Sequence, residues 1–289
     1  MDGYALAASL LPGEWKRAAL ALPQAEARAA EELRLRLGQR MTVLLPEGER
    51  PLPLAPTVTE SALRDLLELV TRASAHAASE QLRRGCVTAK GGCRVGFCGE
   101  AVSEGGRLRT LRTLRSAAVR VPREVKGCAD GIFAALGGTA LPSTLLLSPP
   151  GGGKTTLVRE LVRLLSERGV RVAVADERGE LALTPLSLGR CADVLSLAPK
   201  AEAAMLLLRA MNPQVIAMDE ITAPEDLEAV ELAAGCGVTV LAAAHAVSAE
   251  GLRQRPLYRR LLELGVFRQA VVIRRTAAGG RLLRVEALP

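Results

Sequence analysis

The sequence predicts an α/β fold, in which helices cover both faces of a mainly parallel sheet and a smaller α+β domain precedes it. Three observations carry this prediction. A glycine-rich turn joins an apolar strand at 143–148 to a helix that begins near Lys154. Strand-like and helix-like segments then alternate to the end of the chain, as a parallel sheet requires. Before residue 118, several apolar runs instead repeat every second position, which is typical of antiparallel strands. We therefore expect two domains, 1–118 and 119–289.

The first domain is predicted to mix helices with an antiparallel sheet. Glu32–Leu37 alternates apolar and charged residues, which predicts a half-buried strand with an arginine face. Proline punctuates 46–56, so this segment is predicted to be a surface connection. The remaining elements are helices at 6–22, 24–32, 59–73 and 74–84, and strands at 41–45, 86–89, 91–99 and 107–113.

The second domain is predicted to repeat a strand followed by a helix. Thr222 with Glu225 forms a capping-box pattern, so a helix should begin there and end near Gly235. The other predicted elements are strands at 170–175, 215–218 and 238–244, a helix at 201–211, and a terminal hairpin of 267–274 with 282–285.

The glycine-rich turn has the residue types that bind phosphate. Consecutive glycines allow backbone N–H groups to point inward at an anion, and the helix that follows adds about half a positive charge. Lys154 is expected to contact the terminal phosphates and the Thr155 hydroxyl to bind Mg²⁺. Ser148 stands where the G-x-x-x-x-G-K-[ST] pattern has its first glycine, so we expect a slightly altered loop. The predicted ATP contacts are Ser148, Pro149, Pro150, Gly151, Gly152, Gly153, Lys154, Thr155 and Thr156.

Acidic residues follow the apolar strand at 215–218. Asp219 and Glu220 come directly after it, as in a Walker B segment. Asp219 is predicted to hold Mg²⁺ and Glu220 to polarise the attacking water, because two adjacent buried carboxylates need a cation or donors to satisfy them. The alternative is a helix-capping or surface pair.

Polar residues also end two other strands. Asp176 and Glu177 are predicted to position the water or the metal, with a salt-bridged turn as the alternative. His245 ends the strand expected between the loop strand and the Walker B strand, so it is predicted to sense the γ-phosphate, although an isolated histidine is more often structural. Together these features predict a RecA-like P-loop NTPase domain with strand order 5-1-4-3-2, using ATP and Mg²⁺.

An arginine from a neighbouring subunit often stabilises phosphoryl transfer. Arg94, Arg120 and Arg209 are the predicted candidates, together with Arg190, and the sequence does not choose among them. For any one of them a solvated or salt-bridged role is the alternative.

Composition narrows the class of protein. The chain of 289 residues carries 38 basic and 31 acidic residues, a net charge of +7, and only 2% aromatic residues. The core is therefore expected to be aliphatic, and aromatic stacking on nucleic-acid bases is disfavoured. No signal peptide or transmembrane segment is recognised, so we expect a cytoplasmic protein. The six cysteines show no C-x-x-C pair, so free thiols are expected, with a zinc site at Cys86, Cys93 and Cys98 as the less favoured alternative.

The order of the motifs resembles the stage III sporulation protein AA family over nearly the whole chain. The shared stretches are 32–36, 91–96, 118–121, the phosphate loop, 176–178, 193–195 with 199–202, and 219–220. Cys93, His76 and Ser148 depart from the residues usual in the family. The resemblance implies a relative of hexameric secretion and pilus-retraction ATPases. It also implies a homo-oligomer, expected to be a hexamer, in the mother-cell cytoplasm, bound to membrane proteins of the channel complex between mother cell and forespore.

Two other functions remain open from the residues. The chain could be a P-loop motor or loader acting on nucleic acid through Arg34, Arg36, Arg107, Arg109 and Arg112, although the small charge excess makes this less favoured. It could also be an ATP-binding scaffold without turnover, but such a switch would not need Glu220.

Overall fold

The computed structural model describes residues 3–71, 86–89, 93–105, 107–122, 125–182, 188–276 and 280–288. These residues form two compact units, the first ending at Pro122 and the second beginning at Val125. The boundary predicted between 118 and 119 falls inside strand β6, Arg107–Arg120. Among the described residues, no helix is both long enough and apolar enough to cross a membrane.

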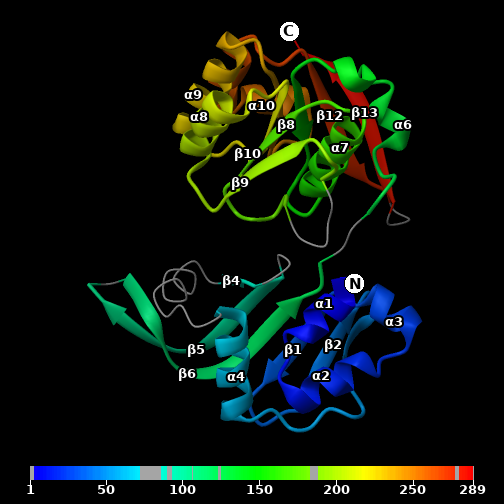
Figure 1. The fold of residues 1–289 in the computed structure, drawn as a ribbon, viewed down its shortest axis with the longest axis vertical. Coiled ribbons are helices and arrows are strands. Elements are labelled where there is room, and N and C mark those ends of the chain that lie inside the picture. Colours follow the sequence, from blue (N-terminus) through cyan, green and yellow to red (C-terminus); the bar gives the residue numbers. More distant parts are fainter. Residues whose placement is uncertain are drawn as a thin grey trace. The chain divides into compact units, whose positions relative to one another are not determined.

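The first unit is an antiparallel sheet with helices packed on one face (Figure 1). The strand order is β3-β2-β1-β6-β5-β4. Apolar residues at alternate positions of β1, such as Leu33 and Leu35, are fully buried in one core with residues of α1, α2 and α4. The elements are α1 (Gly3–Ser9), α2 (Gly13–Leu20), α3 (Gln24–Ala29), β1 (Glu32–Arg36), β2 (Thr42–Leu45), β3 (Gly48–Pro51), α4 (Glu60–Thr71), β4 (Val87–Thr88), β5 (Arg94–Glu104) and β6.

Three predictions for this unit were wrong in detail. The helix expected over 6–22 is two helices, because Pro12 follows the first and Gly13, at φ +30°, begins the second. The segment 46–56 contains strand β3, which pairs with β2 in a tight hairpin. The last strand is twice as long as expected, because β6 pairs with β5 and, at its C-terminal end, with β1. The helix predicted at 74–84 lies outside the described residues.

The second unit is a seven-stranded sheet with helices on both faces, in the order β13-β12-β7-β11-β10-β8-β9. Only the β12–β13 pair is antiparallel. If β7, β8, β10, β11 and β12 are numbered 1 to 5 along the chain, their order across the sheet is 5-1-4-3-2. The strands are β7 (Thr144–Leu147), β8 (Val172–Asp176), β9 (Ala192–Ser196), β10 (Val215–Glu220), β11 (Thr239–Ala244), β12 (Gln269–Arg275) and β13 (Arg281–Ala287).

Aliphatic side chains fill the core on both faces of this sheet. Leu145 and Leu147 of β7 point to the face that carries α8, α9 and α11, whereas Leu146 points to the face that carries α6 and α7 (Figure 1). All four residues of β7 are buried, as expected for a central parallel strand. The helices are α6 (Asp130–Phe133), the 3₁₀ helix η2 (Gly138–Ala140), α7 (Lys154–Glu167), α8 (Lys200–Met211), α9 (Pro224–Gly235), α10 (Ala249–Arg253) and α11 (Pro256–Glu263).

The cap of α9 differs from the prediction. The side chain that reaches back is Asp226, whose Oδ2 accepts hydrogen bonds from the N–H groups of Thr222 (2.7 Å) and Ala223 (3.0 Å). Pro224 begins the helix, so Thr222 lies outside it and Glu225 remains exposed. Asp226 also contacts the site described next.

Candidate nucleotide site

The phosphate loop follows β7 and leads directly into α7. Gly151 and Gly153 adopt φ values of +71° and +101°, which favour glycine. A Cβ at Gly152 would lie 2.3 Å from Oγ of the fully buried Ser148. The loop therefore accommodates Ser148 because position 152 has no side chain. The serine hydroxyl donates to the carbonyl of Pro149 at 2.8 Å, which satisfies it inside the loop.

Lys154 is the first residue of α7, and its ammonium is buried in the mouth of the loop. Nζ donates to the carbonyl of Ser148 at 3.1 Å and lies 2.7 Å from Nδ1 of His245. Burial lowers the pKa of Lys154, and the nearby Glu220 acts in the opposite direction. Both partners of the ammonium are neutral acceptors, so an anion that enters the loop can replace them.

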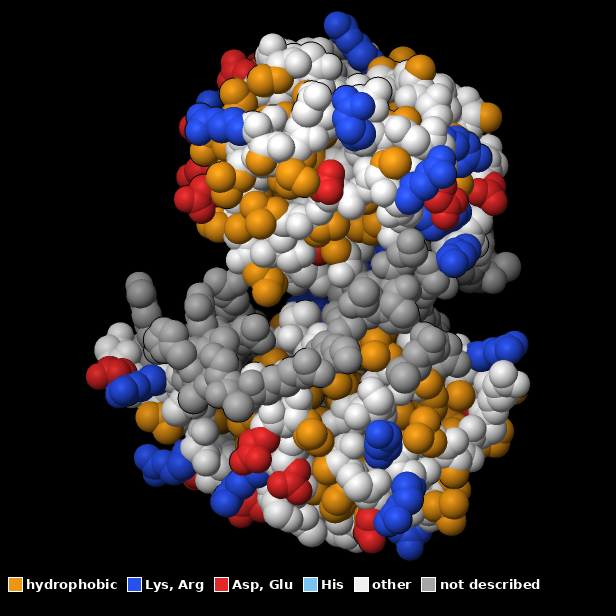
Figure 2. Space-filling view, viewed as in Figure 1, with side chains coloured by type: hydrophobic (Ala, Val, Ile, Leu, Met, Phe, Trp, Pro, Cys, Tyr) orange, Lys and Arg blue, Asp and Glu red, His pale blue; other side chains and the backbone are white. Residues whose placement is uncertain are grey.

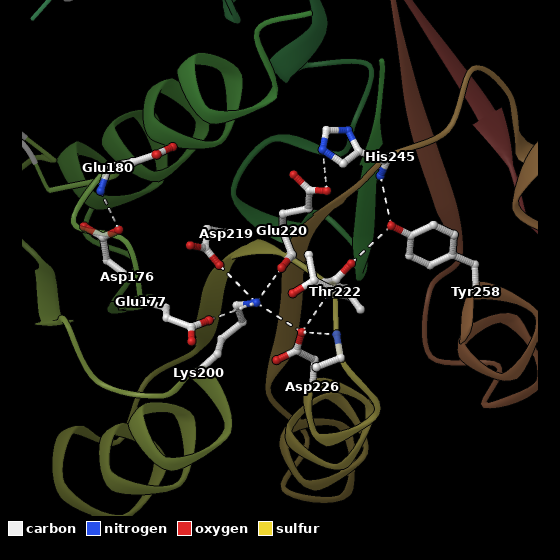
Figure 3. A network of polar contacts seen from close by, with 12 residues as sticks. Asp176, Glu177, Glu180, Lys200, Asp219, Glu220, Thr222, Asp226, His245 and Tyr258 are labelled. Atoms are coloured by element: carbon white, nitrogen blue, oxygen red, sulfur yellow. Dashed lines mark hydrogen bonds and ion pairs between the residues drawn. The ribbon is translucent and has the colours of Figure 1, made fainter. Parts of the chain in front are cut away.

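His245 follows β11 and lies between Lys154 and Glu220. Figure 3 shows its contact with Glu220. Its Nε2 lies 2.6 Å from Oε1 of Glu220. Because Nδ1 faces an ammonium, we assign it as the acceptor and place the proton of the neutral ring on Nε2, which donates to Glu220. Tyr258 fixes the backbone here: the N–H of His245 donates to its hydroxyl at 3.2 Å, and the hydroxyl donates to the carbonyl of Ile221 at 3.2 Å.

Asp219, at the end of β10, is buried and short of hydrogen-bond donors. Neither carboxylate oxygen accepts a hydrogen bond from the described residues, although Oδ1 lies 3.2 Å from Nζ of Lys200 in an ion pair. Burial raises the pKa of Asp219 to about 6, against the lowering effect of Lys200. Buried oxygens without donors are the kind of group that a cation satisfies.

Lys200 lies at the centre of the acidic side of the site (Figure 3). Its side chain is 2% exposed, and Nζ lies 3.1 Å from Oδ2 of Asp226, 3.2 Å from Oδ1 of Asp219 and 3.5 Å from Oε2 of Glu177. Nζ also donates to the backbone carbonyl of Glu220. Burial alone would lower the pKa of Lys200, but Asp219 and Asp226 outweigh it and raise the pKa. This ammonium therefore fixes the end of β10 against α9 and the loop after β8.

Asp176 has a structural environment. The fully buried carboxylate accepts hydrogen bonds from the backbone N–H groups of Glu180 (2.8 Å), Leu181 (3.1 Å) and Ala182 (2.9 Å), which fold the loop back onto the strand end. Arg159 of α7 holds the other side of this loop through the carbonyls of Leu181 and Glu180. These contacts favour the turn alternative for Asp176 over a role with the metal or the water.

The predicted arginines lie in different surroundings. Arg94 donates to Sγ of Cys86 at 3.2 Å, and Arg120 forms an ion pair with Glu32 at 3.3 Å. Both belong to the first unit. Arg209 is exposed in the last turn of α8, and Arg190 is exposed before β9. Arg209 and Arg190 thus remain available at the surface of the second unit.

The zinc alternative finds no support within the described segments, where no three His, Cys, Asp or Glu side chains gather as a metal site would require. Cys93 is buried, and burial raises its pKa to about 12, so its thiol stays protonated. Magnesium differs, because it needs only one or two protein oxygens besides phosphate and water. Asp219, whose buried oxygens accept no hydrogen bond from the described residues, fits that requirement, and Thr155 lies at the start of α7 for a second ligand.

Sequence reasoning did not single out Lys200 or Arg281. Lys200 carries an unusual signal, since a lysine in the first turn of a helix faces the positive end of the helix dipole and needs acidic neighbours to be stable there. Arg281 follows a glycine pair at a hairpin turn, yet its guanidinium lies against Gly153 of the phosphate loop. Nothing in the sequence distinguishes it from the many other arginines.

A family model and a curated relative place the chain in the same family. A family model described as "Sporulation stage III, protein AA" matches residues 10–286. Stage III sporulation protein AA of Bacillus subtilis (strain 168) is 33% identical over 288 residues, which cover 96% of this chain and 93% of that protein. An uncharacterised protein, ycf45 of Porphyra purpurea, is 34% identical over 121 residues, which cover 39% of this chain and 21% of that protein.

Solved structures resemble the fold. The ATPase DotB of Legionella pneumophila aligns with a TM-score of 0.62 and 17% identity, covering 90% of this chain and 77% of DotB. The pilus retraction motor PilT, solved with bound ADP, aligns with a TM-score of 0.64 and 18% identity, covering 90% of this chain and 79% of PilT. At these identities the likeness concerns the fold.

Proposed function

Because this chain belongs to the sporulation stage III protein AA family, we propose that it is a magnesium-dependent ATPase that energises or assembles a channel complex between mother cell and forespore. One observation carries the proposal: Lys154 of the phosphate loop, His245 and Glu220 form a continuous chain of contacts of 2.7 and 2.6 Å beside the orphaned carboxylate of Asp219. The glycine-rich loop, a carboxylate that can act as a base and a second carboxylate that can bind a cation converge there.

Each residue has a distinct role in the proposed reaction. The N–H groups at the start of α7 and the ammonium of Lys154 bind and orient the phosphates of ATP. Asp219 and the hydroxyl of Thr155 would hold Mg²⁺, which would neutralise charge on the phosphate oxygens. Glu220 accepts a hydrogen bond from the attacking water and takes its proton as the bond to phosphorus forms.

His245 is the proposed sensor of the terminal phosphate. Without nucleotide it accepts from Lys154 and donates to Glu220, so both groups are held by one imidazole. When ATP engages Lys154, a phosphate oxygen replaces the Nδ1 contact, while Nε2 keeps its hydrogen bond to Glu220 and orients the carboxylate toward the water. Hydrolysis thereby depends on an occupied loop.

A substitution of Glu220 tests the mechanism. E220Q should bind Mg-ATP with the wild-type affinity yet lose at least about 100-fold in steady-state hydrolysis, because the amide cannot take the proton. E225Q, at an exposed position of α9, serves as the matched control and should hydrolyse ATP normally. Chelating magnesium should stop hydrolysis by the wild type. If E220Q hydrolysed ATP at the wild-type rate, Glu220 would have no part in the reaction. If that hydrolysis also continued without magnesium, the proposed function would be wrong.

We also propose a homo-oligomer, expected to be a hexamer, with an arginine supplied by a neighbouring subunit. Support comes from apolar side chains that remain exposed on one side of the second unit, where Figure 2 shows hydrophobic side chains gathered. They belong to β9, the turn after it, α8 and α9: Val194, Leu197, Met205, Leu206, Met211 and Leu232. A contiguous apolar surface of this kind marks interaction sites. Arg209, exposed at the end of α8, is the candidate nearest to it in the chain.

Membership of the family supports a proposal for the localisation and the partners. We propose that the protein acts in the mother-cell cytoplasm and reaches the membrane through membrane proteins of the channel complex. Fractionation of sporulating cells provides the test: the protein should leave the membrane fraction when those partners are deleted.

The nucleic-acid alternative is weaker, because three of the five arginines on which it rests are locally paired. Arg34 forms an ion pair with Glu32 at 2.8 Å, Arg36 pairs with Glu49, and Arg109 pairs with Glu104 at 3.0 Å. Charges already neutralised by carboxylates gain less from phosphate contacts. Hydrolysis stimulated by DNA or RNA in a salt-dependent manner would reverse this preference.

A further inference from the structure

A cavity opens beside the phosphate loop, and Lys154, His245 and Glu220 are not among the residues that line it. Its volume is about 490 Å³, within the usual range for small-molecule sites. The walls come from the turn before α6, from the loop and α7, and from the terminal hairpin β12–β13: Cys128, Gly153, Leu157, Ile273, Arg281 and Leu283. The loop is therefore a wall of the cavity.

Arg281 presents a positive charge at the loop end of this cavity. Gly153 has no side chain, and a Cβ placed there would lie 2.6 Å from Cζ and 2.9 Å from Nη2 of Arg281, so the guanidinium packs directly on the loop backbone. Within the described part of the chain, Arg281 forms no ion pair and no hydrogen bond. The nearby carboxylate of Glu160 is bound by Arg163 at 2.6 Å and by the N–H of Gly127 at 2.6 Å.

The guanidinium thus adds its charge to the positive end of α7 without an ion pair to any described residue. An arginine beside a helix N-terminus is suited to hydrogen-bond a phosphate oxygen. The remaining walls are aliphatic: Leu157 and Ile273 are buried behind the cavity surface, and Leu283 is half-buried. Such walls suit the flat, weakly polar faces of a nucleobase.

We propose that this cavity holds the nucleoside half of the bound nucleotide and that Arg281 contacts the phosphate next to the sugar. The inference rests on the proposed function, because it takes the terminal phosphates to lie at Lys154. A nucleotide lying along the loop from Lys154 past Gly153 brings its sugar and base against Leu157 and the hairpin. Arg281 then serves binding of ATP and ADP alike, unlike an arginine from a neighbouring subunit that acts on hydrolysis.

Binding measurements with three probes test the role of Arg281. Calorimetry should show R281A binding Mg-ADP and Mg-ATP at least about 10-fold more weakly than wild type, since hydrogen bonds to charged groups contribute this much. The rate at saturating ATP should change less than twofold. R281K should recover part of the affinity, and R284A, an exposed arginine of the same strand, should behave as wild type. Tripolyphosphate has no nucleoside but offers a phosphate at each position along the loop, so its affinity should fall in R281A by about the same factor as the affinity for ADP.

The outcomes separate this inference from the proposed function. If the wild type binds neither ADP nor tripolyphosphate, the proposed function fails. If the wild type binds both and R281A binds ADP as tightly as wild type, the role of Arg281 is overturned. A variant that keeps its affinity and loses only turnover would place Arg281 at the terminal phosphate instead.

The reactivity of Cys128 tests whether the nucleobase lies in this cavity. This thiol lines the cavity, whereas Cys98 and Cys236 are exposed elsewhere and act as internal controls. Burial is the largest of the effects that raise the pKa of Cys128, so labelling is best done at mildly alkaline pH. Saturating ADP should slow the alkylation of Cys128, measured by mass spectrometry, and tripolyphosphate should not. Equal rates with and without ADP would show that the nucleoside lies outside this cavity.

Discussion

At the scale of single residues, the account depends on His245 having two partners at once. An imidazole that bridges an ammonium and a carboxylate can transmit the arrival of an anion from one to the other. The two contacts measure 2.7 and 2.6 Å, and we propose that a change at Lys154 reaches Glu220 through them.

Replacing His245 separates binding from turnover. H245A should bind Mg-ATP with little change, since Lys154 keeps its place in the loop, but should hydrolyse it more than about 10-fold more slowly, because Glu220 loses the group that positions it. H245Q, whose amide can still accept from Lys154 and donate to Glu220, should recover part of the rate. Binding is measured by calorimetry and turnover by phosphate release. If H245A turned over ATP at the wild-type rate, the histidine would be structural.

Glu49 gives a pH-dependent prediction in the first unit. Hydrogen bonding from Arg36, with a further contribution from Thr42, lowers the pKa of Glu49 from 4.5 to about 2. Between these pH values the Glu49 carboxyl binds a proton more readily in the unfolded chain than in the folded one. The contribution of ionised Glu49 to the free energy of unfolding is therefore complete above pH 4.5 and is lost as the pH falls toward 2.

E49Q should lower the free energy of unfolding by about 1 kcal/mol at neutral pH, because the pair is partly exposed to solvent. The difference from wild type should shrink as the pH falls from 4.5 toward 2. E47Q, at an exposed position of the same hairpin turn, should show no such pH dependence. Urea unfolding at several pH values measures the effect, and a constant difference across this range would contradict the assignment.

Residue patterns indicated much of the site but not all of it. Lys154, Asp219, Glu220 and His245 were recognisable because each follows or opens an element with a strong apolar pattern. Asp176 also ends an apolar strand, yet its carboxylate accepts hydrogen bonds from three backbone N–H groups of the following loop. A carboxylate at a strand end can bind either the following loop or a ligand. Which one it binds depends on the conformation of that loop, and the apolar periodicity of the sequence does not predict this conformation.

At the scale of elements, Lys200 ties the site together. Its ammonium reaches β10 through Asp219, α9 through Asp226 and the loop after β8 through Glu177. When an ammonium is buried among carboxylates, each charged group needs the opposite charge to be stable inside the protein.

K200M should therefore lower the free energy of unfolding by about 3 kcal/mol, because it leaves Asp219 and Asp226 buried without their counter-charge. K200R should retain part of the stability, since it keeps the charge. K16M, at an exposed lysine of α2, provides the control and should be neutral. Chemical denaturation measures these differences. A K200M variant as stable as wild type would show that the carboxylates do not depend on Lys200.

The elements themselves were predictable where one face is buried. The alternation in β1 and the continuous apolar runs of β7 and β11 correspond to their burial. Prediction failed at β3 and β9, which lie at sheet edges and bury few side chains, so tertiary pairing and not pattern makes them strands. It also failed at Pro12, where apolar residues on both sides concealed a break between two helices.

At the scale of the whole molecule, the proposed oligomer makes hydrolysis a property of assembled chains. If an arginine from a neighbour completes each site, separate chains bind ATP but turn it over slowly. The rate per chain should therefore rise steeply with protein concentration and level off where sizing detects the oligomer.

L206E, which places a charge on the exposed apolar side of α8, should move this threshold to higher concentration. L54E, at an exposed leucine of the first unit, is the matched control. A rate per chain that is the same at every concentration, including those at which only monomers are present, would contradict a shared site.

The central claim is that the loop from Ser148 to Lys154 binds the phosphates of ATP. Calorimetric titration of Mg-ATP into wild type and K154A tests it most directly, with unfolding curves to confirm that both are folded. Wild type should bind one nucleotide per chain and K154A should bind it at least about 100-fold more weakly, because the loss of a charge-assisted contact to phosphate is large. Equal binding by the two proteins, or no binding by the wild type, would contradict it.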